Sequence, residues 1–153
     1  MIEPLSLRRA VAADAPAVLA LTRMAYAKWV PLIGREPKPM TADYERAVAE
    51  HIIDLWEEGG ELLALIEMIP EVDCLLIENI AVRSGQQGRG IGKQLLLHAE
   101  RLAHSLGFDN VRLYTNAAFE SNLQLYSRHG YQEFQRVAVA PGSVVVHMRK
   151  RID

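Results

Sequence analysis

Residues 83–107, RSGQQGRGIGKQLLLHAERLAHSLG, place a cluster of glycines directly before a long amphipathic segment. Five apolar residues then follow at the spacing of one helix face: Ile91, Leu95, Ala99, Leu102 and Leu106. Gly107 is well placed to end that helix. The preceding residues, LLIENIAV, are nearly all apolar and predict a strand. A glycine-rich turn between a strand and a helix predicts an anion site, because the first N–H groups of a helix lack partners inside it.

Two familiar phosphate-binding motifs do not fit this turn. A P-loop ending at Gly92-Lys93 would need a glycine where Gln87 stands and a hydroxyl where Gln94 stands. The dinucleotide fingerprint G-x-G-x-x-G would need its third glycine at Lys93 or Leu95. The remaining pattern is Q-x-x-G-x-G, formed by GRGIG and the glutamine before it. The anion is therefore neither a P-loop nucleotide nor a dinucleotide of the usual kind.

The rest of the chain predicts an alternation of strands and helices in one domain, residues 1–153. The predicted strands are Leu5–Val11, Ile52–Glu57, Glu61–Ile69, Cys74–Val82, Asn110–Thr115 and two closing strands, YQEFQRVAV and SVVVHMRK. The predicted helices are 14–28, a shorter one capped by Thr41 with Asp43 near its positive end, the long helix from Ile91, and 117–129. The prolines and glycine of residues 30–40 predict a loop. This order predicts a mixed α/β fold.

Composition excludes several classes of protein. Half of the 153 residues are hydrophobic and the formal net charge is -2, so no basic excess points to nucleic acid. No apolar run approaches the roughly 20 residues that span a bilayer, so we expect no membrane contact. The N-terminal residues lack the layout of a signal peptide, and we expect a cytoplasmic protein. His98 and His104 lie off the spacing of paired ligands on a helix, so we assign no metal.

Two motifs together resemble a known family. The Q-x-x-G-x-G turn after a strand ending in IAV resembles the acyl-CoA-binding signature of the GNAT N-acetyltransferase superfamily. LQLYSRHGY, residues 123–131, is similar to the second signature of that family, a helix carrying Leu-Tyr and ending in Gly and an aromatic residue. The resemblance covers residues 5–149. It implies a GNAT-like, mostly antiparallel sheet of about seven strands flanked by about four helices, with acetyl-CoA as acyl donor.

The resemblance also implies which residues contact CoA. The backbone of the turn would hold the pyrophosphate, with positive charge added by Arg89 and Lys93; these residues are Gln87, Gly88, Arg89, Gly90, Ile91, Gly92 and Lys93. The main chains of Ile80, Ala81 and Val82 would pair with pantetheine. The family commonly has asparagine where Phe119 stands, so Asn122 is the preferred replacement. Asn116 is the alternative, although an asparagine there also suits a helix cap.

Two side chains are candidates for acid–base chemistry. Glu78 lies within a nearly apolar strand, where a regular pleat would place it on one face with Leu76, Ile80 and Val82. It is the candidate general base, acting through a water molecule; the alternative is an ion pair with an arginine such as Arg8, Arg9 or Arg112. The resemblance implies that Tyr126 is the general acid at the CoA sulfur. The alternative is a tyrosine of the apolar core.

The acceptor is expected opposite CoA, beside residues 26–44. That segment offers Tyr26, Trp29, Arg35 and Tyr44, and Glu67 is expected to face the same cleft. Aromatic side chains there suit an amine pocket, and Trp29 equally suits a loop anchor. We expect a small-molecule amine as acceptor. Two alternatives stay open, namely an acyl-CoA-binding sensor without catalysis and an O-acyltransferase. The apolar closing strands are also consistent with a homodimer.

Overall fold

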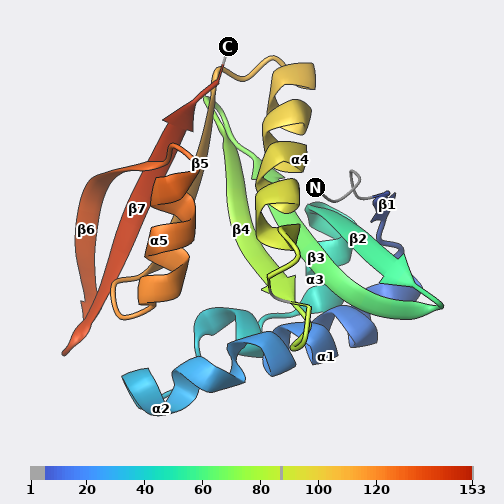
Figure 1. The fold of residues 1–153 in the computed structure, drawn as a ribbon, viewed down its shortest axis with the longest axis horizontal. Coiled ribbons are helices and arrows are strands. Elements are labelled where there is room, and N and C mark those ends of the chain that lie inside the picture. Colours follow the sequence, from blue (N-terminus) through green and yellow to red (C-terminus); the bar gives the residue numbers. More distant parts are fainter. Residues whose placement is uncertain (1–5, 87, 153) are drawn as a thin grey trace.

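A computed structural model of the chain describes residues 6–86 and 88–152. Within these ranges, seven strands form one sheet in the order β1-β2-β3-β4-β5-β7-β6. The strands are β1 Arg8–Arg9, β2 Ile52–Glu58, β3 Glu61–Pro70, β4 Leu75–Val82, β5 Asn110–Asn116, β6 Gln132–Ala140 and β7 Ser143–Arg151. Only β4 and β5 pair in parallel; the other neighbouring strands are antiparallel (Figure 1). The predicted mixed, mostly antiparallel α/β fold is confirmed.

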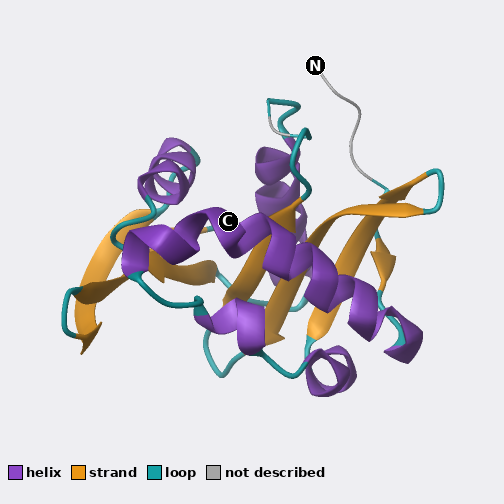
Figure 2. Ribbon diagram, turned by 90° about the horizontal axis from the view of Figure 1, so that it is seen from below, coloured by secondary structure: helices purple, strands orange, loops and turns teal. Residues whose placement is uncertain are grey.

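Helices cover both faces of the sheet. They are α1 Ala15–Tyr26, the single-turn α2 Val30–Ile33, α3 Tyr44–Glu50, α4 Ile91–Ser105 and α5 Glu120–Arg128. Helices α4 and α5 lie in front of the sheet in Figure 1, whereas α1 and α2 run along its lower end, as the view from below in Figure 2 also shows. None of the helices in the described ranges is both long and apolar enough to cross a membrane.

Two apolar clusters hold these layers together. Leu95 and Ala99 of α4 are fully buried against the sheet in the larger cluster. Val18 and Leu21 of α1 are buried with Ile53 of β2 in the smaller one. Each buried leucine or valine contributes about 1.5–3 kcal/mol relative to an exposed one. The apolar spacing of α4 therefore predicted its buried face correctly up to its last turn, where Leu106 is 47% exposed.

The segment between α1 and α3 differs from its prediction. We expected a loop over residues 30–40, but α2 forms a helical turn with Pro31 near its start, and a 3₁₀ helix spans Lys38–Thr41. Proline is tolerated in a first helical turn because the N–H that it lacks would have no partner there. The predicted Thr41 cap is also wrong, because the Asp43 side chain accepts the hydrogen bond from the Arg46 amide.

The first strand is shorter than predicted. The predicted strand over residues 5–11 is reduced to the two residues of β1. The two closing strands form as predicted, and β6 and β1 lie at the outer edges of the sheet, whereas β7 is flanked by β5 and β6. A homodimer through the closing strands stays a prediction, and strand pairing there would use the edge of β6.

The sheet opens between its two parallel strands. Strands β4 and β5 pair only where Leu75–Ile77 run beside Val111–Leu113. Beyond this point β4 continues to Val82 and β5 continues to Asn116, but the two strands no longer pair with each other. They diverge in Figure 1. Helix α4 begins after the free end of β4, and α5 begins after the free end of β5. The opening therefore gathers the glycine turn, both predicted signatures and the start of the segment 26–44.

Candidate active site

A β-bulge at Glu78 decides which way the central strand presents its side chains. Strand β3 pairs Glu67 with Asn79 and Met68 with Ile77, so Glu78 has no partner residue. Ile77 and Ile80 consequently both pack on the α4 side of the sheet. The prediction that Glu78 shares a face with Ile80 and Val82 is therefore wrong. A bulge adds one residue and reverses the alternation beyond it.

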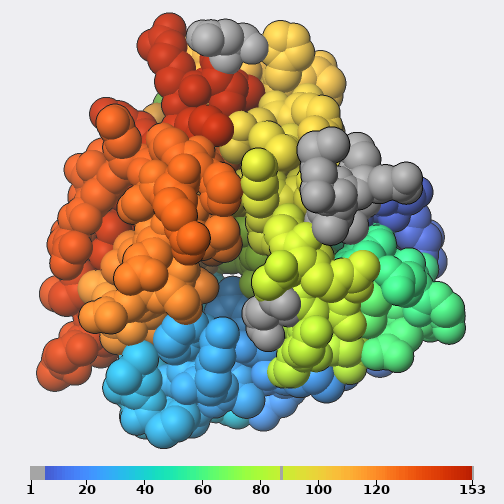
Figure 3. Space-filling view, in the orientation of Figure 1, coloured from blue at the N-terminus to red at the C-terminus, as the bar shows by residue number. Residues whose placement is uncertain are grey.

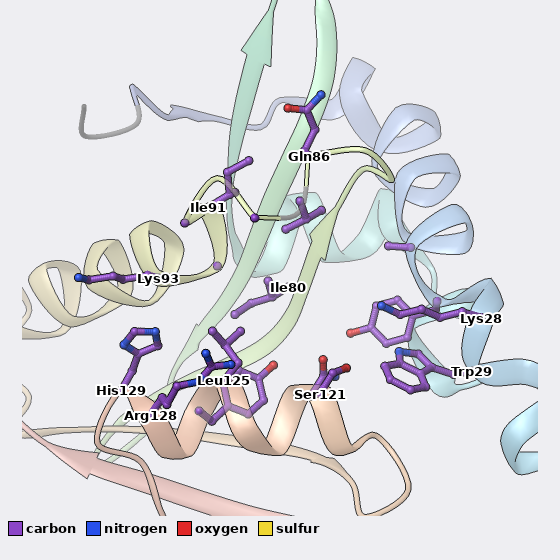
Figure 4. A pocket seen from close by; sticks show the side chains of 18 residues that line it. Lys28, Trp29, Ile80, Gln86, Ile91, Lys93, Ser121, Leu125, Arg128 and His129 are labelled. Atoms are coloured by element: carbon purple, nitrogen blue, oxygen red, sulfur yellow. The ribbon is translucent and has the colours of Figure 1, made fainter. Parts of the chain in front are cut away.

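The first pocket lies on the α4 side of the opening. It has a volume of about 520 Å³ and is formed by the ends of α1 and β4, the glycine turn, the start of α4 and the length of α5. Figure 3 shows the surface hollowed between these segments, and Figure 4 shows the side chains that converge on it. The predicted cofactor residues that line it are Ile80, Val82, Gly88, Gly90, Ile91, Gly92, Lys93 and Asn122.

The backbone of the glycine turn is shaped for close approach by a ligand. Gly88 and Gly90 have φ values of 84° and 74°, in the left-handed region that favours glycine. Gly90 is the N-cap of α4 and has no side chain to satisfy the N–H groups that follow it. A Cβ at Gly92 would lie 3.1 Å from Leu125 of α5, so glycine there permits close packing of the two helices. The turn therefore lies at the positive end of a 15-residue helix, whose first N–H groups have no partners within the helix.

Positive side chains surround the same pocket. Figure 4 shows Lys93 of α4 with Arg128 and His129 at the end of α5 on one side, and Lys28 on the other. Among residues 6–86 and 88–152, no carboxylate pairs with Lys28, Lys93 or Arg128. Burial and the charges of Lys93 and Arg128 lower the pKa of His129. The donor set fits a polyanion such as the phosphates of CoA.

Three predicted cofactor residues remain: Arg89, Ala81 and Gln87. The Arg89 guanidinium turns away from the pocket, donating to Gln86 Oε1 at 2.6 Å and lying 5.3 Å from the Trp56 ring centroid. The Ala81 side chain is buried in the smaller cluster, so only its main chain is available to a ligand. Gln87 lies outside the described residues.

Tyr126 is the predicted acid, and the structure places it in the wall of the first pocket and in the larger apolar cluster at once. Its side chain is 8% exposed. Burial raises the pKa of Tyr126 to about 12, so the phenol is protonated at neutral pH. Asn122, one turn earlier on α5, lines the same pocket and lies 3.4 Å from the Thr115 hydroxyl.

The second pocket contains the predicted base. It has a volume of about 620 Å³ and lies between the 26–39 segment and strands β5, β6 and β7. The Tyr114 hydroxyl donates a hydrogen bond to Glu78 Oε1, and both residues line this pocket. Burial and the bond to Glu78 raise the pKa of Tyr114 well above its ordinary value. Arg8, Arg9 and Arg112 bond to other carboxylates, so the alternative ion pairs of Glu78 do not form.

Tyr26 and Asn116 also line the second pocket, and Tyr26 lines the first pocket as well. The Tyr26 hydroxyl donates to Asn79 Oδ1 at 2.8 Å. The Asn79 amide donates in turn to Thr22 at 3.2 Å and to Tyr44 at 3.3 Å. This buried network fixes Tyr26 at the boundary between the two pockets. Sequence reasoning missed Asn79, although a polar residue in an apolar strand is a signal for it.

Two other predicted acceptor residues face a third, smaller pocket of about 450 Å³, which Glu78 also lines. Tyr44 lies there with its hydroxyl donating to the Pro39 carbonyl at 2.7 Å. Glu67 lies there 2.6 Å from His51 Nδ1. Burial raises the pKa of Glu67, and the bond to His51 partly offsets this.

Trp29 does not reach the second pocket but lines the first. Its ring stacks on Phe119 with centroids 4.3 Å apart and planes 16° apart. Phe119 lines the second pocket, so this stacked pair separates the two pockets. Trp29 thus anchors the segment that follows α1 to the start of α5.

A strand that ends at a glycine turn and a helix start, beside a splayed sheet, places this chain among mixed α/β folds with a pocket at the opening of the sheet. The family model described as Acetyltransferase (GNAT) family matches residues 18–131, and the chain belongs to that family. A curated relative, the uncharacterized N-acetyltransferase YvbK of Bacillus subtilis, is 39% identical over 56 residues. That match covers 37% of this chain and 36% of the relative, so it spans about a third of the relative's length.

Solved structures share the fold at low sequence identity. The PaiA N-acetyltransferase of Thermoplasma acidophilum, in complex with coenzyme A, has a TM-score of 0.78 and 16% identity, covering 96% of this chain and 98% of that one. An acetyltransferase of Bacillus subtilis in complex with CoA has a TM-score of 0.77 and 19% identity, covering 97% of this chain and 99% of that one.

Proposed function

We propose that this protein transfers an acetyl group from acetyl-CoA to the amine of a small molecule bound in the second pocket. The observation that supports this most directly is the pair of pockets on the two sides of one opening in the sheet. The first pocket offers free N–H groups and unpaired cations, and the second contains Glu78. Tyr26 belongs to both, so ligands in the two pockets would meet beside it.

In this proposal the first pocket holds CoA. The amides at the start of α4, together with Lys28, Lys93 and Arg128, bind the phosphates. The free edge of β4 beyond Ile77 leaves the main chains of Ile80, Ala81 and Val82 available to the amide groups of pantetheine. Acetyl-CoA would supply an acyl group activated as a thioester.

Glu78 and Tyr126 divide the proton transfers between them. The amine nitrogen forms a bond to the acetyl carbonyl carbon, and the carbon–sulfur bond breaks. Glu78, directly or through a water molecule, takes the proton that the amine loses. The Tyr126 phenol donates a proton to the departing sulfur, which its protonated state at neutral pH permits. Tyr26 and the stacked pair of Trp29 and Phe119 shape the boundary where this occurs.

Thiol release from acetyl-CoA with a panel of amines and alcohols tests the proposal. We expect CoA to raise the melting temperature and at least one amine to be acetylated. CoA binding and turnover should both require Gly88 and Gly90, but only turnover should require Glu78 and Tyr126. CoA binding with no turnover on any member would favour the sensor, and turnover confined to alcohols would favour O-acyl transfer. No binding of CoA at millimolar concentration would refute all three.

A further inference from the structure

The segment after α1 brings two cations to the second pocket, and one of them, Lys38, also lines the third pocket beside Glu67. Arg35 and Lys38 both line it, and within residues 6–86 and 88–152 no carboxylate forms an ion pair with either. Glu36, the acidic residue between them, bonds instead to Arg23 at 2.6 Å. Surface arginines usually find a carboxylate when one is near. Two unpaired cations on a pocket wall indicate a ligand that brings its own negative charge.

Arg35 is held in place by the far wall of the pocket. Its Nη2 donates to Ser143 Oγ at 2.8 Å, and Ser143 also accepts from Asn116 Nδ2 at 3.0 Å. Ser143 is only 5% exposed, so this anchor is rigid. A guanidinium has five N–H donors in a fixed plane, and the bond to Ser143 uses one of them. The remaining donors are available to a carboxylate.

The anchored guanidinium lines the same pocket of about 620 Å³ as the proposed base. Tyr114, which bonds to Glu78, and Asn116, which bonds to the anchor Ser143, are two residues apart on β5. Both chains of contacts therefore start from neighbouring positions on the same face of β5. A ligand that offers an amine to Glu78 and a carboxylate to Arg35 must carry both groups within this one pocket. An amino acid carries both groups.

One wall of the second pocket is apolar. Val137 and Val139 of β6 are 36% and 54% exposed, although both line it. Ile33, Pro37 and Pro39 face them from the segment after α1. Apolar side chains left exposed beside a pocket suit an apolar ligand surface. An acceptor made only of charged groups would leave this wall uncovered.

We propose that the acceptor is an amino acid with an apolar side chain. Its amine lies at Glu78, its carboxylate at Arg35 and Lys38, and its side chain against the valines of β6. This inference rests on the proposed acetyl transfer, and it adds that the acid group selects the acceptor without taking part in the reaction. A polycationic amine would meet two like charges in the same pocket.

Matched acceptors test the role of the acid group. Phenylalanine, phenylalaninamide and 2-phenylethylamine share one apolar side chain, and only the first has a carboxylate; methionine and methioninamide form a second pair. We expect kcat/KM to be at least tenfold higher for the acids than for their amides. Arg35→Gln should reduce this preference to within about threefold, mainly by lowering kcat/KM for the acid. Arg101→Gln is the matched control, because Arg101 is an exposed residue of α4 outside the three pockets.

Calorimetric titration of the CoA-saturated protein with the same compounds separates this inference from acetyl transfer itself. Tighter binding of the acid than of its amide, lost in Arg35→Gln, supports the inference even where no product forms. Equal binding and turnover of acid and amide would overturn it, as would a preference that survives in the Arg35→Gln, Lys38→Gln double variant. Failure of every amino acid to bind would also overturn it, while CoA binding would still report on the first pocket.

Discussion

The bond between Tyr114 and Glu78 makes the sharpest prediction for stability. Both side chains are partly buried, and the Tyr114 hydroxyl donates to the carboxylate. A hydrogen bond to a charged group contributes about 1.5–3 kcal/mol, and one between neutral groups about 0.5–1.5 kcal/mol. Tyr114→Phe should therefore cost about 1.5–3 kcal/mol of unfolding free energy in the native background. The same Tyr114→Phe substitution should cost about 1 kcal/mol less in the Glu78→Gln background, because the glutamine amide oxygen still accepts the bond but carries no charge.

Urea unfolding of the four proteins in this double-mutant cycle measures the coupling. Phenylalanine keeps the ring that lies 5.8 Å from the His147 ring, so the cycle isolates the hydroxyl. Effects that add to within about 0.3 kcal/mol would refute a charged bond between the two groups. A changed slope against urea in one variant would instead report a change in the unfolded ensemble.

The same variants separate the base from its partner in turnover. Glu78→Gln should lower kcat/KM by about 10²–10⁴, the usual contribution of a general base. The deficit should shrink at alkaline pH, where the free amine has already lost its proton. Tyr114→Phe leaves the carboxylate in place and should lose less than about tenfold. If Tyr114→Phe lowers kcat/KM as much as Glu78→Gln does, the Tyr114 hydroxyl is the group that turnover requires. Near-normal turnover of Glu78→Gln would show that Glu78 is not the base.

Three further perturbations test the first pocket and the core. Gly88→Ala places a side chain at a φ of 84° in open space, so it should cost about 1–2 kcal/mol and weaken CoA binding by about 5–30-fold in calorimetry; an unchanged Kd would contradict the role of the turn. Alanine variants of Trp29 and Phe119 should show a coupling of about 0.5–1.5 kcal/mol in unfolding, and additivity would argue against the observed stacking. Burial raises the pKa of all five tyrosines. Because the folded pKa values are raised, the stability that depends on neutral phenols is fully present below about pH 10 and is lost as the pH rises through the folded values. For Tyr126, whose pKa rises from 10.0 to about 12, the loss is about 3 kcal/mol. Tyrosinate absorbance should therefore stay low near pH 10 and appear together with unfolding. Titration of the tyrosines near pH 10 in the folded protein would refute the claim that burial raises their pKa values.

Local patterns predicted most of the fold. The apolar runs predicted as strands over 52–57, 61–69 and 74–82 correspond to β2, β3 and β4. The long helix followed from its apolar spacing. Residues 30–40 were predicted wrongly, because their three prolines and one glycine were together read as a loop. The effect of proline depends on position, and the first turn at Pro31 tolerates it.

The glycine turn was predictable for the same reason that the fold was. Its donors are consecutive amides, so the sequence contains the whole site. The cations that complete it are harder to predict. Lys28 lies in the turn after α1, and Arg128 lies at the end of α5. A cation can be recognised as unpaired only when its neighbours from other elements are known.

The second pocket depends on register, which spacing along the chain does not specify. Tyr114 meets Glu78 because β5 runs parallel to β4 with Leu113 beside Ile77, after a connection that includes the whole of α4. The bulge adds a second unpredictable step. In a regular strand Glu78 would share the side of Ile80, which lines the first pocket. One extra residue in β4 turns Glu78 toward Tyr114 instead, so a single strand presents apolar side chains to one pocket and a carboxylate to the other. In the proposed function, the bulge thus decides which pocket contains the base, and removing the bulge should abolish turnover while CoA binding persists.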